Sequence, residues 1–473
     1  MKKAMSILLV LLLLASMTVC GTADNSTNNN DPGKTPAADS QPDANTTDKD
    51  SDDALQFSLE PREFKKGATI EETILVDEYN VRITAVELSY GNYAAELTLV
   101  IENNSDKDLS FIAESFGYSC NSINGYMVPE GYLNCDVAAG KKARDSISIS
   151  YDTLMLYGIF EIADIEIGFD ISDDDYNHTY TGPCSILTTA ADGYDYSTPV
   201  YRENIASKGS QAEYDYSVLY FSTDTVYEEN GLVIASQTVV ENQNGESILL
   251  LEVVNNSDTA VGVSTTNIDI NGLRVCDSTW SYDTINPGKT AIVNVDFSSV
   301  LDPEYWDIYG ITEVGNAALK VSFKNDDNEE ISNPAFLSID IPGANNSFSM
   351  EGTEVYNGNG VRIISKGVYA DPSKYSDDLH ILMVAENTSG RTLLLDNVYN
   401  SLSVNDYMTA YSFYSKTIED GASVMIDIRL WGYGLEDINI TEASQIQSVE
   451  FSLTIEDQNY NEIDDVTVVF SVE

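Results

Sequence analysis

The chain has 473 residues, enough for about three domains, and its 42% hydrophobic content is that of a globular protein. It carries 77 acidic residues against 24 basic ones, a formal net charge of −53. So acidic a surface repels phosphate backbones and anionic lipid headgroups. We therefore expect no nucleic-acid partner and no direct binding of the protein surface to a membrane.

The first residues have the layout of an export signal. Two lysines precede an unbroken apolar run, residues 4–16, which is too short to span a bilayer comfortably. Cys20 follows, and this order resembles the lipobox of bacterial lipoproteins, in which the thiol receives the lipid. We expect residues 1–20 to be a lipoprotein signal peptide and Cys20 to be lipidated. Ordinary cleavage after Ala23 is the alternative.

Residues 21–55 contain no aromatic residue and no apolar cluster. Such a segment cannot bury enough surface to offset its ordering entropy, so it is expected to be a disordered acidic tether. The lipid would then supply the whole attachment to the membrane. This predicts an exported protein on the outer face of the cytoplasmic membrane, with only its lipid in the bilayer.

The rest of the chain passes through the same landmarks three times. A strand runs into an Asn-Ser or Asn-Thr turn in LTLVIENNS, LLEVVNNS and ILMVAENTS. Next come the Asn-Gly or Asn-Asp turns of SINGYMV, DINGLRV and SVNDYMT, a strong hairpin signal because these residues tolerate positive φ. A glycine turn and another alternating strand then follow at Gly140, Gly288 and Gly421.

This repetition predicts equivalent core positions in the three copies. Leu99, Leu251 and Leu382 are expected to be buried at the same place in each copy. His380 is expected where the other copies have Leu97 and Leu249, as a partly buried, hydrogen-bonded residue.

About seven short strands per copy, separated by turns every eight to twelve residues, predict an all-β protein of three tandem immunoglobulin-like β-sandwiches. A small β-barrel is the alternative. The expected boundaries are 56–190 for the first sandwich, 191–211 for a linker, 212–343 for the second sandwich and 344–473 for the third. The chain resembles Gram-positive bacterial lipoproteins built of repeated immunoglobulin-like domains. That resemblance implies a fold and a cell-surface location, and no functional residue.

Cys120 and Cys135 lie on either side of the turn at Asn124 and Gly125. If the flanking strands pair across this turn, the two thiols come within disulfide range in an oxidising compartment. We therefore take this pair as the disulfide candidate. Two free thiols are the alternative.

Two further features have a functional and a structural interpretation. Acidic hairpin tips could hold Ca²⁺ weakly or could be solvated turns. Tyrosines between the first two copies could form a recognition surface or could pack the segment against its neighbours. The acidic tips are at Asp173, Asp174 and Asp175, at Asp326, Asp327, Glu329 and Glu330, and at Glu456, Asp457, Asp464 and Asp465. The aromatic residues are Tyr194, Tyr196, Tyr201, Tyr214, Tyr216, Tyr220 and Phe221.

The sequence has no nucleophile elbow, no glycine-rich phosphate loop and no zinc-binding H-E-x-x-H motif. We expect no enzyme, no cofactor and no metal centre. The favoured interpretation is a binding or scaffold lipoprotein with an unknown protein or glycan ligand. A passive envelope spacer and a carbohydrate-binding surface protein are the alternatives.

Overall fold

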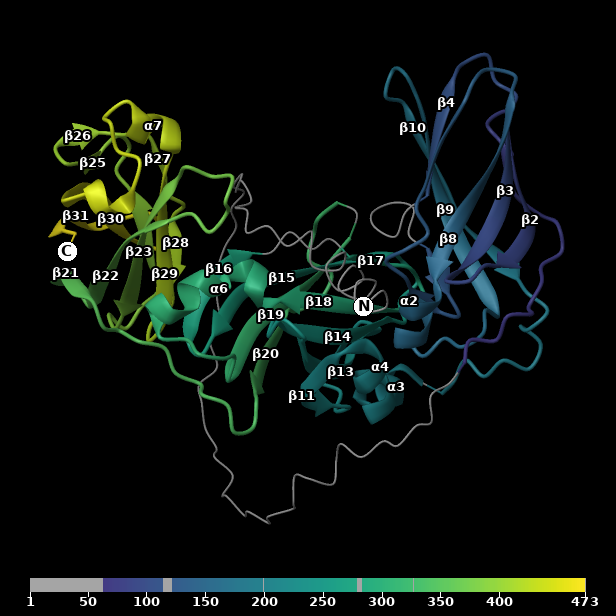
Figure 1. Ribbon diagram of the computed structural model, residues 1–473, viewed down its shortest axis with the longest axis horizontal. Coiled ribbons are helices and arrows are strands. Elements are labelled where there is room, and N and C mark those ends of the chain that lie inside the picture. The colour runs from purple at the N-terminus through teal and green to yellow at the C-terminus, as the bar shows by residue number, and fades with distance from the viewer. Residues whose placement is uncertain (1–62, 114–120, 199, 279–282, 326, 473) are drawn as a thin grey trace, which may run out of the picture.

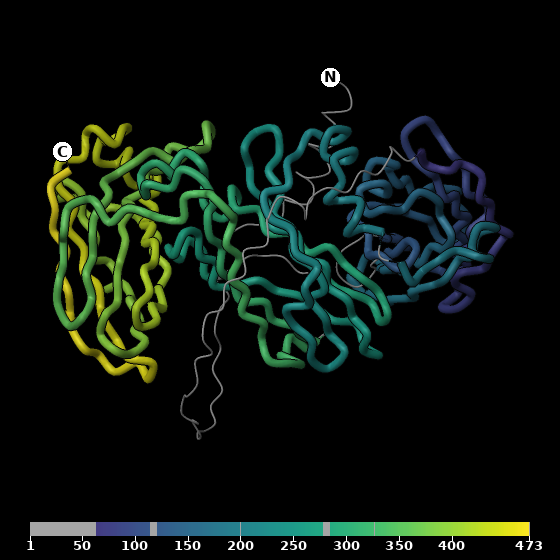
Figure 2. Tube along the Cα trace, turned by 90° about the horizontal axis from the view of Figure 1, so that it is seen from below, coloured from purple at the N-terminus to yellow at the C-terminus, as the bar shows by residue number. Residues whose placement is uncertain are grey.

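The computed structural model describes residues 63–472 except 114–120, 199, 279–282 and 326. The expected signal peptide, Cys20 and the tether at 21–55 lie outside this part of the chain. Figure 1 shows three β-rich lobes, here called modules 1, 2 and 3, and Figure 2 shows them in a row. The described helices are short, and none of them is long and apolar enough to cross a membrane.

Module 1 is a sandwich of two sheets, and one sheet has the order β1-β2-β3-β8. Its strands are β1 (Thr73–Glu78), β2 (Val81–Tyr90), β3 (Ala94–Asn103), β4 (Leu109–Ala113), β5 (Ser122–Ile123), β6 (Tyr126–Met127), β7 (Leu133–Val137), β8 (Lys142–Ser150), β9 (Asp164–Asp173) and β10 (His178–Leu187). Helix α2 (Tyr151–Leu156) follows β8.

Module 2 follows two short helices, α3 (Val200–Ala206) and α4 (Lys208–Tyr214). Its strands are β11 (Tyr216–Ser222), β12 (Tyr227–Glu229), β13 (Leu232–Asn242), β14 (Ser247–Asn255), β15 (Val261–Ile270), β16 (Leu273–Ser278), β17 (Asp283–Ile285), β18 (Lys289–Asp296), β19 (Asn316–Lys324) and β20 (Ala335–Asp340). Helices α5 (Phe297–Val300), α6 (Pro303–Trp306) and η2 (Asp307–Tyr309) follow β18.

Module 3 repeats the arrangement. Its strands are β21 (Thr353–Gly358), β22 (Val361–Ala370), β23 (Leu379–Asn387), β24 (Leu393–Asn397), β25 (Ser403–Val404), β26 (Tyr407–Met408), β27 (Tyr411–Ser412), β28 (Lys416–Ile418), β29 (Ser423–Leu430), β30 (Ser448–Asp457) and β31 (Glu462–Ser471). Helix α7 (Gly432–Glu436) follows β29, and η3 (Ala443–Gln445) precedes β30. The predicted all-β fold of three immunoglobulin-like sandwiches is confirmed.

One asparagine in the Asn-Ser or Asn-Thr turn recurs in all three modules and is buried. We call it the Asn clamp. The side-chain amides of Asn103, Asn255 and Asn387 each donate to two backbone carbonyls, at 2.7–2.9 Å. Each side-chain oxygen accepts from the backbone N–H of the serine two residues later, at 2.9–3.0 Å. The residue satisfies every polar group it buries and ties three chain segments together, which explains the recurrence of the Asn-x-Ser phrase.

The Asn of the hairpin turn is a second clamp. Asn124, Asn271 and Asn405 all have φ near +50°. Each side-chain amide donates to a backbone carbonyl just before the neighbouring strand of the same sheet, at 2.7–2.9 Å, and each side-chain oxygen accepts from two backbone N–H groups there. The hairpin is thus fixed against the strand that enters the last hairpin of its module.

The expected core equivalence is wrong by one residue in module 3. Counted back from the Asn clamp, Leu99 and Leu251 correspond to Met383, and all three lie in the core cluster of their own module. Leu382 is fully buried too, but it belongs to the core cluster of module 2. Likewise Ile381, and not His380, corresponds to Leu97 and Leu249. Strand β23 is covered on both faces, so its apolar residues do not alternate and the register was misread.

The modules are joined by strand pairing as well as by packing. Strand β6 of module 1 pairs in parallel with β18 of module 2, with Tyr126 opposite Thr290. Strand β16 of module 2 pairs in parallel with β29 of module 3, with Leu273 opposite Ser423. One sheet therefore continues from each module into the next. Both junctions use the second strand of the Asn-clamped hairpin and the strand after the glycine turn.

Candidate functional site

The predicted Cys120–Cys135 disulfide is not formed. Cys135 is a buried free thiol on β7, and Cys120 lies outside the described residues. The hairpin at Asn124 pairs only β5 with β6, whereas β7 pairs with β4 and places Cys135 opposite Phe111. The strand pairing across the Asn124 turn on which the disulfide prediction rested therefore does not include β7.

The acidic hairpin tips use their carboxylates within the turn. Asp173 accepts from the backbone N–H groups of Asp175 and Asn177 and pairs with Lys107 at 2.5 Å. Asp457 makes the same pattern with Asn459 and Asn461. The Lys107 hydrogen bond at Asp173 and the Asn461 hydrogen bonds at Asp457 hold the pKa of each carboxyl below its usual range.

Within the described ranges, no group of three or more His, Cys, Asp or Glu side chains is placed to hold a metal ion. Asp326 falls outside those ranges. The turn interpretation is favoured because the side-chain oxygens already accept from the turn itself.

The tyrosines between modules 1 and 2 mostly pack. Tyr201, Tyr214 and Tyr216 are buried in the core cluster of module 1. The hydroxyl of Tyr216 donates to the carbonyl of Ile205 at 2.7 Å. Tyr196 remains exposed. The packing alternative is therefore confirmed for this segment, whose helices α3 and α4 occupy much of the expected linker 191–211.

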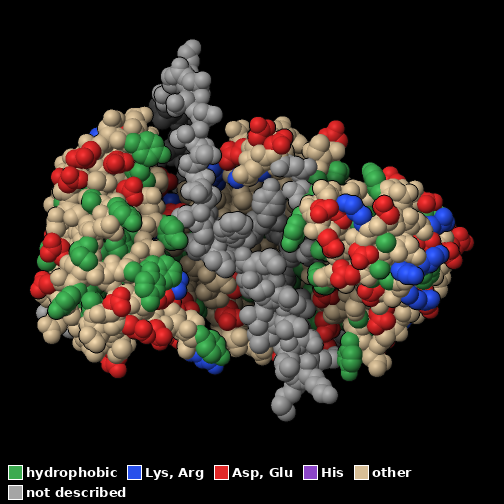
Figure 3. All heavy atoms as spheres, turned by 90° about the horizontal axis from the view of Figure 1, so that it is seen from above, with side chains coloured by type: hydrophobic (Ala, Val, Ile, Leu, Met, Phe, Trp, Pro, Cys, Tyr) green, Lys and Arg blue, Asp and Glu red, His purple; other side chains and the backbone are tan. Residues whose placement is uncertain are grey.

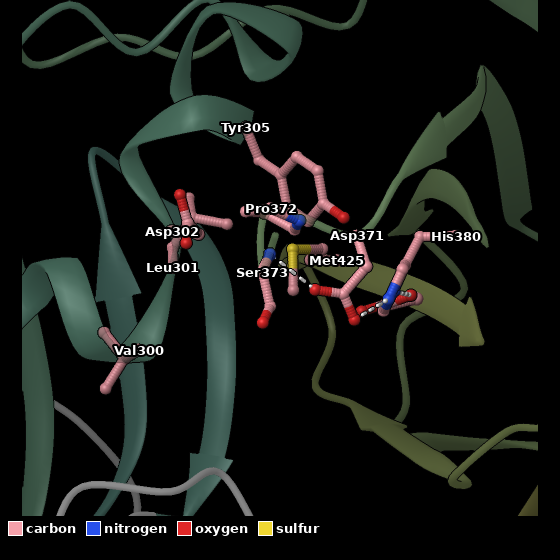
Figure 4. A pocket seen from close by; sticks show the side chains of 10 residues that line it. Val300, Leu301, Asp302, Tyr305, Asp371, Pro372, Ser373, His380 and Met425 are labelled. Atoms are coloured by element: carbon pink, nitrogen blue, oxygen red, sulfur yellow. Dashed lines mark hydrogen bonds and ion pairs between the residues drawn. The ribbon is translucent and has the colours of Figure 1, made fainter. Parts of the chain in front are cut away.

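A cavity of about 310 Å³ lies at the junction of modules 2 and 3 (Figure 4). His380 lines it and is held between two carboxylates, Nδ1 at 2.7 Å from Asp427 and Nε2 at 3.3 Å from Asp371. The Tyr305 ring of module 2 lies 5.9 Å from the imidazole, and its hydroxyl donates to the carbonyl of Ala370 at 3.1 Å. With both ring nitrogens bonded to carboxylates, the imidazole as a cation ties the segment before β23 to β29 within module 3, beside the Tyr305 ring of module 2.

The His380 site predicts a pH-dependent junction. Burial lowers the imidazole pKa, but the hydrogen bonds and charges of Asp427 and Asp371 outweigh it, and the net pKa is raised above 6.5. The stabilisation is therefore complete below pH 6.5 and is lost as pH rises through the folded-state pKa. We expect the free energy of unfolding of module 3 to fall as pH rises above 6.5, and His380→Gln to abolish that slope.

Hydrogen exchange of residues 371–380 at each pH measures this effect. His178→Gln, at the partly exposed histidine of module 1, is the matched control and should keep the slope. A slope that survives His380→Gln would show that another group titrates.

The end of module 3 carries exposed apolar side chains. Tyr407 and Met408 on β26 are 61% and 57% exposed, and Tyr433 on α7 is 66% exposed. The two elements adjoin, since Gly434 packs closely against Ala410. We call Tyr407, Met408 and Tyr433 the distal face. Figure 3 shows hydrophobic side chains spread over this lobe.

The equivalent elements are covered in modules 1 and 2. Met127 of module 1 is buried in the core cluster of module 2. Arg274, at the same position of module 2, is largely buried and pairs with Glu419 of module 3 at 3.3 Å. Tyr305, on the helix after the glycine-turn strand, reaches into module 3. The distal face is therefore the counterpart, on module 3, of the surfaces that join modules 1, 2 and 3, and it is exposed. The SVNDYMT landmark contained this information, but sequence patterns alone did not show that its equivalents join modules.

No family model and no curated protein matches the chain. Among solved structures, it is similar to the red sea bream transglutaminase (12% identity, 56% of this chain and 31% of that chain, TM-score 0.15). It is also similar to part of a 1.5-MDa bacterial ice-binding adhesin (12% identity, 80% and 90%, TM-score 0.14) and to the central fibronectin-III array of RIM-binding protein (9% identity, 87% and 99%, TM-score 0.14). The chain spans less than a third of the transglutaminase, and TM-scores this low carry no functional argument.

Proposed function

We propose that the protein is a cell-surface, membrane-anchored, non-enzymatic lipoprotein that acts as a binding or scaffold protein through the distal face of module 3. One observation carries this proposal. The surface that modules 1 and 2 use to hold the next module is uncovered on module 3 and exposes Tyr407, Met408 and Tyr433. Aromatic residues and methionine are enriched at protein interfaces, and an exposed apolar surface marks interaction sites.

The test compares ligand capture by two full-length variants with that of the wild type. Tyr407→Asp combined with Met408→Asp changes only exposed side chains and should keep the fold while abolishing capture from an envelope extract. Phe336→Asp, at a still more exposed side chain on β20 of module 2 (77% exposed), should leave capture unchanged. A glycan array with the same three proteins tests the carbohydrate alternative. Failure of the wild type to retain anything in both assays would favour the passive spacer.

The anchor has its own prediction. The order of positive residues, apolar run, Cys20 and polar tether supports lipidation of the Cys20 thiol. We expect the wild type to partition into detergent, and Cys20→Ala to move the protein to the aqueous phase or leave it unprocessed. Mass spectrometry of the mature N-terminus provides the direct measurement. A wild-type N-terminus at unmodified Asp24 would contradict the proposal and indicate a secreted protein.

A further inference from the structure

We propose that copies of this chain associate head to tail, with β26 of module 3 in one copy pairing in parallel with β8 of module 1 in the next. The inference rests on the proposed function, since it names the occupant of the distal face. It follows from the parallel strand pairing that occurs at both module junctions within the chain.

Both internal junctions have the same register. Their paired residues are the first one after the hairpin turn, Tyr126 or Leu273, and the second one after the glycine of the glycine turn, Thr290 or Ser423. At the two ends of the chain these landmarks fall on Tyr407 of β26 and Lys142 of β8. The repeated register therefore predicts that Tyr407 of one copy lies opposite Lys142 of the next.

Both strands have an open edge. In the described part of the chain, β8 pairs only with β3 and is the edge strand of its sheet, and β26 pairs only with β25. An exposed strand edge is a template for pairing with another chain. The two free edges are the two halves of the junction already seen between modules, so they are complementary in direction as well as position.

Ion pairs also connect neighbouring modules at the internal junctions. Lys289, directly after the glycine of module 2, pairs at 2.7 Å with Glu166 on β9 of module 1, and both side chains are largely buried. At the second junction the equivalent positions hold Ala422 and Ala318. The ion pairs that cross this junction are Arg274 with Glu419 at 3.3 Å and Lys416 with Asp277 at 2.7 Å.

The free ends hold a matched pair as well. Lys141 follows Gly140 as Lys289 follows Gly288, and Glu450 lies opposite Ser403 as Glu166 lies opposite Ser122. Both side chains are exposed in the single chain. The register of the proposed contact thus brings Lys141 of one copy to Glu450 of another, in the geometry of the Lys289–Glu166 pair.

The side chains on the outer face of module 1 indicate how strong the contact between two copies should be. Basic side chains gather on this lobe in Figure 3, and Lys142 and Arg144 of β8 are exposed there. Apolar junction residues such as Leu250 and Ile292 are replaced at the equivalent positions by Thr98 and Arg144. The contact between copies should therefore be weaker than the internal junctions and should depend on the high local concentration of chains tethered to one membrane. Because it joins different surfaces, it can be repeated from copy to copy, giving closed rings or open chains according to the rotation between copies.

Directed disulfide formation between two variants of the full chain tests the register. Lys142→Cys and Tyr407→Cys proteins are mixed and oxidised, because directly paired residues of neighbouring strands lie within disulfide range. We expect the mixed dimer to form several-fold more than in a control mixture of Ser146→Cys with Tyr407→Cys. Ser146 is exposed on the same strand but four residues from the predicted partner. The parent chain, with its free thiols Cys135 and Cys184, gives the background.

Charge reversal tests the predicted ion pair. Lys141→Glu in the Lys142→Cys protein should lower the dimer yield, and Glu450→Lys in the Tyr407→Cys partner should restore it. A yield equal to the Ser146→Cys control, or no rescue by the second reversal, would overturn the head-to-tail contact. In that case, capture abolished by the Tyr407→Asp and Met408→Asp variant would still support the proposed function with another partner. Loss of both results would refute the two proposals together.

Discussion

Asn255→Ala is expected to destabilise module 2 by about 3 kcal/mol, because it removes the side-chain donor to the buried carbonyl of Ile285 and to the carbonyl of Thr259. The acceptor for Ser257 is lost as well. Asn256→Ala is the matched control, since Asn256 is exposed and only its backbone N–H takes part in the turn.

Urea unfolding, with hydrogen exchange to assign the change to module 2, measures the effect. The control should stay within about 0.5 kcal/mol of the wild type, as for most surface substitutions. Equal stability of Asn255→Ala and Asn256→Ala would contradict the clamp.

The second large effect is expected at the junction of modules 1 and 2. Glu252 on β14 is 2% exposed, accepts from the Arg202 side chain of α3 at 2.5 Å and from the Ser236 hydroxyl at 2.8 Å. Arg202→Met leaves this carboxylate buried without its cation and should cost about 3–5 kcal/mol. Hydrogen exchange across residues 200–214 and the unfolding midpoint report the change.

The double variant Arg202→Met with Glu252→Val is the matched rescue. Val100 and Val384 occupy the position of Glu252 in the other modules, so the site accepts valine. The double variant should recover most of the lost stability, because no buried charge remains. Loss of the same size in the single and double variants would show that the Arg202 stem, and not its charge, holds the junction.

Sequence patterns predicted the three sandwiches because turn residues and the alternation of apolar and polar residues can be recognised within short segments of the chain. Strands such as β3 alternate between a buried and a more exposed face, and the Asn clamps repeat in every copy. The register of β23 was misread because module 2 covers its outer face, and a strand buried on both faces has no alternation. The positions of Leu382 and His380 thus depend on a neighbour that the pattern of one strand cannot reveal.

The candidate surface was not predictable from the residues alone. SVNDYMT has the same form as SINGYMV and DINGLRV, yet Tyr407 and Met408 are exposed, whereas the equivalent strands of modules 1 and 2 pair with the next module. The disulfide expectation for Cys120 and Cys135 failed for a related reason. The turn at Asn124 is a two-residue hairpin whose strands are very short, and the chain then leaves to pair with β4.

The central claim is that one junction surface recurs three times and is left open on module 3. Hydrogen exchange of the three hairpins in the dilute full-length protein tests this claim most directly. The module that follows should protect the backbone amides of residues 122–127 and 271–276 from exchange. Residues 403–408 should exchange faster, because no module lies against them in the structure. Equal protection of all three hairpins in the dilute protein would contradict the account, because it would mean that module 3 has no open junction surface.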